Sequence, residues 1–190
     1  MKKIVGICLA VMMMVFASSI VIAEDSTDEY GIWNIDEFVD EFDMPTGVYF
    51  IISDPLHGKF SNSATTNSDV TAYLFCQNYS DVKEPFIRLR MYEYDSILVK
   101  NAYSSNNEEY DIIMMDGAGV KHNLTGYMLS QSSDIRIIDD EEIATVINAL
   151  KEGGTVRFAI VDSENSLNKY SFAIDEADGF DKAYSDWLAK

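Results

Sequence analysis

The residues best suited to hold a polar ligand lie in one run, Ser61–Ser68, which reads Ser-Asn-Ser-Ala-Thr-Thr-Asn-Ser. Hydroxyl and amide groups both donate and accept hydrogen bonds, so this run can form a loop that faces a ligand. The same side chains can instead satisfy the backbone groups of a polar turn, which is their more common role. The candidate ligand-binding residues in the run are Ser61, Asn62, Ser63, Thr65, Thr66 and Asn67.

Two tyrosines of a later strand-like segment, Tyr92 and Tyr94, are further candidates for ligand binding. A tyrosine ring has an apolar body and a polar tip, which suits a glycan or a protein surface. Tyr127 belongs to another strand-like segment and has the same properties. Tyrosines at such positions are also common in the core or on the surface of a sheet.

Two acidic segments have the residue types of a calcium site. In Asp175–Asp181, the carboxylates of Asp175, Asp178 and Asp181 lie around a glycine, and calcium takes several oxygen ligands from a flexible loop. The segment lacks the distal bidentate glutamate of an EF-hand. A second segment, Asp139–Glu142, is a candidate of the same kind. Both segments also suit the start of a helix, where acidic side chains complement the dipole, and this simpler role is favoured.

No catalytic residue is predicted. The chain has no Gly-x-Ser-x-Gly elbow and no Ser-x-x-Lys in a matching context. Its two histidines, His57 and His122, fall in a turn and in a strand, with no spacing that indicates a base or a metal ligand. Cys76 is in phase with the apolar residues before it, which indicates a core thiol. Enzymatic activity is therefore unsupported, although a hydrolase with a carboxylate or histidine site in a cleft stays open.

The chain begins like an exported protein. Lys2 and Lys3 precede an apolar run over residues 4–22 that ends at Ala23, which predicts a signal peptide over residues 1–23. The alternative is an uncleaved membrane anchor, but no basic residue follows the run until Lys59. We expect an acidic flexible lead-in over residues 24–33, a single globular domain over residues 34–190, and no transmembrane segment in the mature chain.

The net charge of the chain limits the classes of partner that it is expected to bind. Removing Lys2 and Lys3 with the leader shifts the formal net charge from −18 to −20. This charge argues against nucleic acid and anionic membrane surfaces, which both attract basic proteins. It favours solubility outside the cell, with cationic partners or divalent cations as the alternative. Only Cys76 remains after cleavage, so no disulfide forms within the mature chain and the apolar core must stabilise it.

Three segments have helical apolar spacing. Ile35, Phe38, Val39 and Phe42 predict a helix over residues 35–42, Asp139 or Asp140 starts a second one that ends at Gly153, and Phe180–Leu188 forms the third. The remaining apolar segments alternate with period two, as strands do. The predicted strands cover residues 48–53, 59–61, 70–76, 86–94, 110–114, 120–128, 134–138, 156–160 and 170–174.

These strands follow one another through short turns, without the alternation with helices that builds a parallel sheet. The sequence therefore predicts a mainly β protein. Its expected fold is an antiparallel β-sandwich or partly closed barrel of about 8–9 strands, with three short peripheral α-helices.

Several short motifs resemble an uncharacterised family of exported or lipid-anchored proteins of Gram-positive gut-type bacteria. The most specific is Gly58-x-Phe60-Ser61-Asn62-Ser63-Ala64-Thr65-Thr66-Asn67-Ser68. The others are Asp40-Glu41-Phe42-x-x-Pro45-Thr46-Gly47, Met91-Tyr92-Glu93-Tyr94, Tyr110-Asp111-Ile112, Val146–Lys151 and Tyr170-x-Phe172-x-Ile174. The resemblance spans most of residues 35–188 and implies export and association with the cell envelope, without catalytic residues to transfer.

The function expected from the sequence is a non-enzymatic binding or interaction module at the cell envelope. Its partner is expected to be a protein or a glycan, and no cofactor is expected apart from the calcium hypothesis. The alternative is the extracytoplasmic hydrolase described above.

Overall fold

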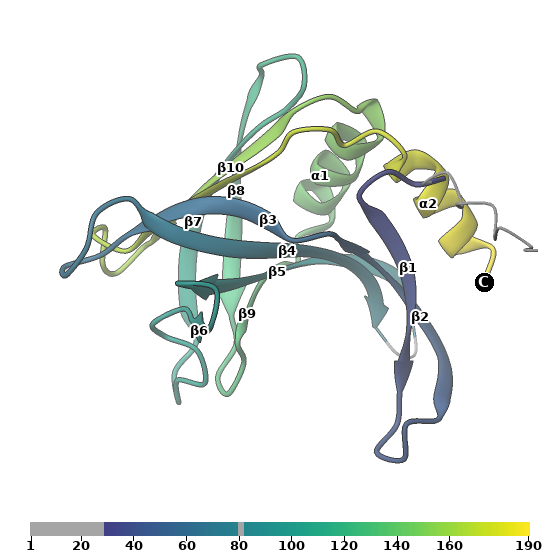
Figure 1. The fold of residues 1–190 in the computed structure, drawn as a ribbon, viewed down its shortest axis with the longest axis horizontal. Coiled ribbons are helices and arrows are strands. Elements are labelled where there is room, and N and C mark those ends of the chain that lie inside the picture. The colour runs from purple at the N-terminus through teal and green to yellow at the C-terminus, as the bar shows by residue number, and fades with distance from the viewer. Residues whose placement is uncertain (1–28, 80–81) are drawn as a thin grey trace, which may run out of the picture.

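A computed structural model describes residues 29–79 and 82–190 of the chain, so the predicted signal peptide and residues 24–28 lie outside the described residues. Figure 1 shows the arrangement of its elements. The strands are β1 (Trp33–Val39), β2 (Pro45–Ser53), β3 (Leu56–Ser61), β4 (Ser68–Tyr79), β5 (Val82–Glu93), β6 (Ile97–Leu98), β7 (Glu108–Met115), β8 (Lys121–Met128), β9 (Asp134–Ile137), β10 (Val156–Asp162) and β11 (Lys169–Ile174). The helices are α1 (Asp140–Glu152) and α2 (Phe180–Leu188).

Eight of the strands close into an antiparallel barrel. Their order around the wall is β4-β3-β11-β10-β7-β8-β9-β5, and the β4–β5 pairing closes the ring. The predicted mainly β class is confirmed. The finer prediction is partly wrong: the barrel is closed, and the described chain has eleven strands and two helices.

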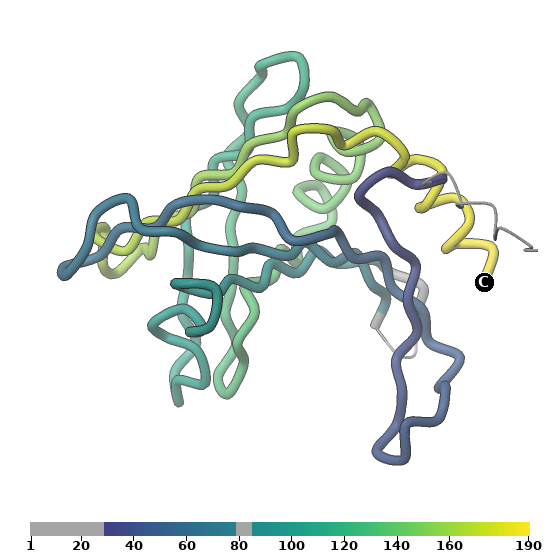
Figure 2. The backbone as a smooth tube through the Cα atoms, viewed as in Figure 1, coloured from purple at the N-terminus to yellow at the C-terminus, as the bar shows by residue number. Residues whose placement is uncertain are grey.

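The remaining strands add to the barrel wall at places where a barrel strand pairs with two different strands along one edge. β4 pairs with β3 through residues 68–72 and with β2 through residues 75–77. The β1–β2 hairpin therefore leaves the barrel at this point and projects away from it, as the tube in Figure 2 shows. β6 likewise adds to the end of β5.

Side chains fill the barrel interior. The predicted inward row of β5, Ile87, Leu89 and Met91, is at most 1% exposed, and Ile112 and Met114 of β7 are equally buried. This confirms the period-two alternation, which places every second residue on the core face. The interior is a packed apolar core.

Both observed helices agree with their sequence patterns. The Asp139 side chain accepts hydrogen bonds from the backbone N–H groups of Glu141 and Glu142, which fixes the start of α1. Gly153 ends that helix with a φ of 77°, a conformation that favours glycine. α2 packs against the β1–β2 hairpin, and its Phe180 ring meets the Trp33 ring edge-on.

The predicted helix over residues 35–42 is wrong, because this segment forms β1 and pairs with β2. A register shift between Glu37 and Val39 interrupts the strand alternation. Ile35 packs against the core, whereas Phe38 packs against Phe50 on the other face of the strand. The two apolar residues therefore serve different faces of a strand, although their spacing imitates that of one helix face. Phe42, which completed the helical pattern, is 75% exposed in the turn that follows.

The folded body also begins earlier than predicted. Trp33, assigned to the flexible lead-in, is buried as the first residue of β1, and its indole N–H donates to the Ala177 carbonyl oxygen at 3.2 Å. Among the described residues, no helix is long and apolar enough to cross a membrane.

Candidate functional site

The polar run Ser61–Ser68 forms the turn between β3 and β4, and its side chains are largely used within that turn. The Asn62 carboxamide oxygen accepts hydrogen bonds from the backbone N–H groups of Ala64 and Thr65, at 2.8 and 3.0 Å. The Ser61 hydroxyl accepts one from the Asn67 N–H at 3.1 Å. These contacts favour the turn role of the run. Of the six candidates, the exposed ones are Ser63, Thr66 and Asn67.

The structure separates the two candidate tyrosines. Tyr94 follows β5 with a φ of 51°, is exposed, and meets the Phe60 ring edge-on beside the polar turn. Tyr92 lies on the outer face of β5, where its ring is perpendicular to that of Tyr73 at 6.1 Å. The predicted ligand-binding residues therefore belong to two different regions.

Tyr92 is part of a larger surface on the outside of the barrel, which we call the aromatic–arginine surface. Strands β4, β5 and β9 present its side chains, which alternate with the buried ones of the same strands. Its members are Thr71, Tyr73, Phe75, Arg88, Arg90, Tyr92, Asp95, Asp134 and Arg136. A hollow of about 320 Å³ lies over its β4–β5 part and is also lined by Ile52 of β2.

Two arginines of this surface contact one carboxylate, and a third arginine lies beside them. Arg90 binds Asp134 in a bidentate manner, at 2.6 and 3.0 Å, and the Arg88 guanidinium lies 3.5 Å from the same carboxylate. Arg136 is the cross-strand neighbour of Arg88. The cluster therefore has a local excess of positive charge.

The three arginines differ in the contacts that their guanidinium groups make. Arg88 stacks 3.9 Å from the centre of the Phe75 ring. Within the described part of the chain, its Nε and that of Arg136 are buried without a hydrogen-bond partner. Burial lowers the pKa of Arg88, and the charges of Arg90 and Arg136 lower it further against the attraction of Asp134. Hydrogen bonding to Asp134 raises the pKa of Arg90.

The candidate calcium ligands are not gathered by the fold. Asp181 lies in the first turn of α2 and forms an ion pair with Lys151 at 3.6 Å, while the Asp175 carbonyl accepts the Thr155 hydroxyl at 3.0 Å. Asp178 lies against Gly153. Over residues 29–79 and 82–190, no three carboxylate, histidine or cysteine side chains are placed to hold a metal ion. A calcium role stays a prediction.

The two histidines lie apart. His57 is exposed on β3. His122, on β8, contacts the Asp116 carboxylate at 2.8 Å and lines a hollow of about 390 Å³ with three acidic residues, Asp139, Glu141 and Glu142. The contact with His122 lowers the pKa of Asp116, together with hydrogen bonds from two backbone N–H groups. Among the described residues, Asp116 is the carboxylate that forms a hydrogen bond with His122.

Cys76 is fully buried, as its phase in β4 predicts. Burial raises the pKa of its thiol to about 12. Since the thiolate is the nucleophilic form, the thiol is inert at neutral pH.

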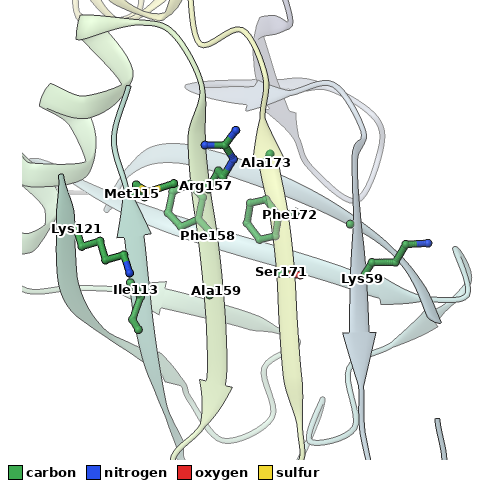
Figure 3. Close-up of a pocket in the computed structure, with 11 residues that line it drawn as sticks. Lys59, Ile113, Met115, Lys121, Arg157, Phe158, Ala159, Ser171, Phe172 and Ala173 are labelled. Atoms are coloured by element: carbon green, nitrogen blue, oxygen red, sulfur yellow. The ribbon is translucent and has the colours of Figure 1, made fainter. Parts of the chain in front are cut away.

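The sequence does not predict the third hollow, which we call the basic groove. Figure 3 shows its lining on β3, β11, β10, β7 and β8, with Lys59 and Lys121 on opposite flanks. The groove encloses about 520 Å³. The alternation within each strand predicts small outward residues, such as Ala159 and Ser171. It does not predict the strand order that places these residues side by side.

These observations define the class of protein: a closed antiparallel barrel with a filled interior, whose described residues line three hollows on its surface. Comparison with protein families, curated proteins and solved structures found no match to this chain. The resemblance to an exported or lipid-anchored family stays a prediction.

Proposed function

We propose that this protein is a non-enzymatic binding module of the cell envelope and that its aromatic–arginine surface binds an anionic glycan. One observation carries the proposal. Three neighbouring arginines, two of which contact Asp134, share this single carboxylate in a chain that has 32 acidic and 14 basic residues. Such a local reversal of charge favours an anionic ligand.

The arginine chemistry specifies the charged part of the ligand. A guanidinium presents a planar fork of donors that matches a carboxylate or a phosphate. Asp134 binds Arg90 in a bidentate manner, whereas the described structure shows no bidentate carboxylate for Arg88 or Arg136. A ligand carboxylate or phosphate beside these two guanidinium groups would supply a second counter-charge.

The neighbouring side chains suit the sugar part. Tyr73 and Tyr92 are half-buried, so their rings can pack against an apolar sugar face. Thr71 and Asp95, which contact each other, add hydrogen-bonding groups for sugar hydroxyls at the edge of the hollow. The volume of this hollow, about 320 Å³, is at the lower end of the range of small-ligand sites, about 300–1,000 Å³.

Titration calorimetry with oligomers of a hexuronic acid tests the proposal. We expect binding that weakens with added salt and that is lost when the carboxylates are methyl-esterified. Arg136→Gln removes one cation without leaving Asp134 unpaired and should weaken binding about tenfold, the effect of one charge-assisted hydrogen bond. Tyr92→Ala should weaken it to a similar degree.

Arg157→Gln is the matched control, because it removes the same charge from the basic groove on another part of the wall. It should leave the affinity unchanged. Equal losses for Arg136→Gln and Arg157→Gln would reduce the binding to a general effect of net charge and reject this surface as the site.

A hydrolase is the second candidate function, and the hydrogen bond between His122 and Asp116 is the observation that favours it. A histidine held by a carboxylate beside a polar hollow has the arrangement of a general base. If the hydrolase is correct, incubation with the same oligomers should yield shorter products, and His122→Ala should abolish their formation. Unchanged oligomers would dispose of this candidate for this substrate class.

A further inference from the structure

The basic groove is an unusual surface for so acidic a chain. Its flanks carry Lys59, Lys121 and Arg157, and none of its lining residues is acidic. Lys59 pairs with Asp69, while no ion pair is found for Lys121 or Arg157 within the described structure. Between these cations lies an exposed apolar floor that includes Ile113, which is 44% exposed (Figure 3).

The turn of the β1–β2 hairpin has the complementary composition. We call residues 39–44 the hairpin tip. Val39, Phe42 and Met44 are 55%, 75% and 60% exposed, and the carboxylates of Glu41 and Asp43 are exposed beside them. Clustered exposed apolar side chains indicate an interaction site.

The hairpin tip is held in one conformation before any partner arrives. The Asp40 carboxylate accepts hydrogen bonds from the backbone N–H groups of Phe42 and Met44, both at 2.9 Å. Asp43 lies in the left-handed region with a φ of 59°, and its N–H donates to the Asp40 carbonyl. A preorganised loop loses little entropy on binding, so its apolar side chains contribute more to affinity.

The two surfaces cannot meet within one molecule. Figure 1 shows the hairpin tip at the lower right, far from β7 and β10 at the upper left. A contact between them therefore joins two molecules, and it uses a different surface on each. Such a contact is heterologous and leaves a free tip at one end and a free groove at the other.

From the matched charge and apolarity of these surfaces, we propose that the protein associates head to tail, with the hairpin tip of one copy in the basic groove of a second copy. Phe42 and Met44 lie on the apolar floor between Ile113 and Ala159. Glu41 and Asp43 approach Arg157 and Lys121. The proposal is independent of the glycan surface, which lies on other strands of the barrel wall.

Sedimentation velocity across a range of concentrations tests the association on protein purified from expression of the full chain. The wild type should form dimers and longer species as concentration rises, and added salt should reverse this. Two variants should remain monomeric: Phe42→Ser with Met44→Ser, which removes the apolar tip, and Arg157→Glu with Lys121→Glu, which reverses the groove charge. All four side chains are exposed, so circular dichroism should show both variants folded.

Mixing the two variants gives the decisive result. The tip variant keeps an intact groove and the groove variant keeps an intact tip, so one heterologous contact remains possible between them. The mixture should form a one-to-one dimer and nothing larger. A wild type that stays monomeric at every concentration, or a mixture without the dimer, would overturn the proposal.

Discussion

The indole N–H of Trp33 donates a hydrogen bond to the carbonyl oxygen of Ala177, 144 residues later in the chain. This contact joins the first strand to the loop before the last helix, and the Trp33 ring meets that of Phe180 at 4.8 Å. The start of the described chain is thereby fixed to its end.

We expect Trp33→Ala to lower the free energy of unfolding by about 3–5 kcal/mol, as for other large aromatic side chains removed from a core. Trp33→Phe retains most of the ring packing but loses the N–H donor, so it should cost about 1–2 kcal/mol. Urea denaturation measures both. Equal losses for the two variants would show that the hydrogen bond, and not the packing, dominates.

Among the polar residues of the aromatic–arginine surface, Asp134 should be the one whose substitution lowers the free energy of unfolding most. Asp134→Asn leaves Arg88 and Arg90 facing each other without a counter-charge, and breaking such a buried pair costs about 3–5 kcal/mol. Asp69→Asn is the control, because it makes the same change in the exposed pair with Lys59, which is worth about 0–1 kcal/mol. Thermal and urea unfolding of both variants would show the difference, and similar small losses would contradict it.

Glu93 should make stability depend on pH. Burial raises the pKa of its carboxyl, while the Tyr170 hydroxyl, which donates to it at 2.9 Å, offsets part of that rise. A raised pKa in the folded state favours folding below the unfolded pKa, near 4.3, and this contribution is lost as pH rises through the folded pKa. Glu93→Gln should therefore be stabilising relative to the wild type at neutral pH and less so in acid.

Tyr170→Phe provides the companion measurement for Glu93. It removes the donor that stabilises the ionised carboxylate, so the pKa of Glu93 should rise further and the loss of stability towards neutral pH should become steeper. Unfolding curves between pH 4 and pH 8 test both variants. A flat difference between Glu93→Gln and the wild type across this range would exclude Glu93 as the source.

The Cys76 thiol should resist modification in the native protein. It is fully buried, and its pKa is about 12, so the thiolate population at neutral pH is negligible. Iodoacetamide labelling followed by peptide mass spectrometry should find Cys76 unmodified under native conditions and fully modified in denaturant. Rapid native labelling would mean that β4 opens locally.

The local elements were largely predictable from sequence, because period-two alternation and helix capping depend on neighbouring residues. Asp139 and Gly153 marked the ends of α1, and the inward row of Leu89 was visible in its strand. The helix predicted from Ile35 was wrong because this segment pairs with β2, and that tertiary contact decides its structure.

The candidate binding surface depended still more on tertiary contacts. Tyr92 was chosen for its residue type, and its place on an outer wall follows from alternation. Arg88 and Arg136 are 48 positions apart in the chain, and only the pairing of β5 with β9 makes them neighbours. Strand order of this kind is set by the whole fold, so the excess of positive charge could not be derived from local spacing.

The contacts that join the two ends of the described chain also set how the domain can be presented. Lys182 of α2 forms an ion pair with Glu29, and Tyr30 donates a hydrogen bond to Asp186, so both ends lie at one pole of the molecule. The turn of residues 61–68 lies at the opposite pole in Figure 1. Attachment through either end would therefore hold the domain in the same orientation. The turn of residues 61–68 would point away from the attachment point, and the barrel wall would be accessible from the side.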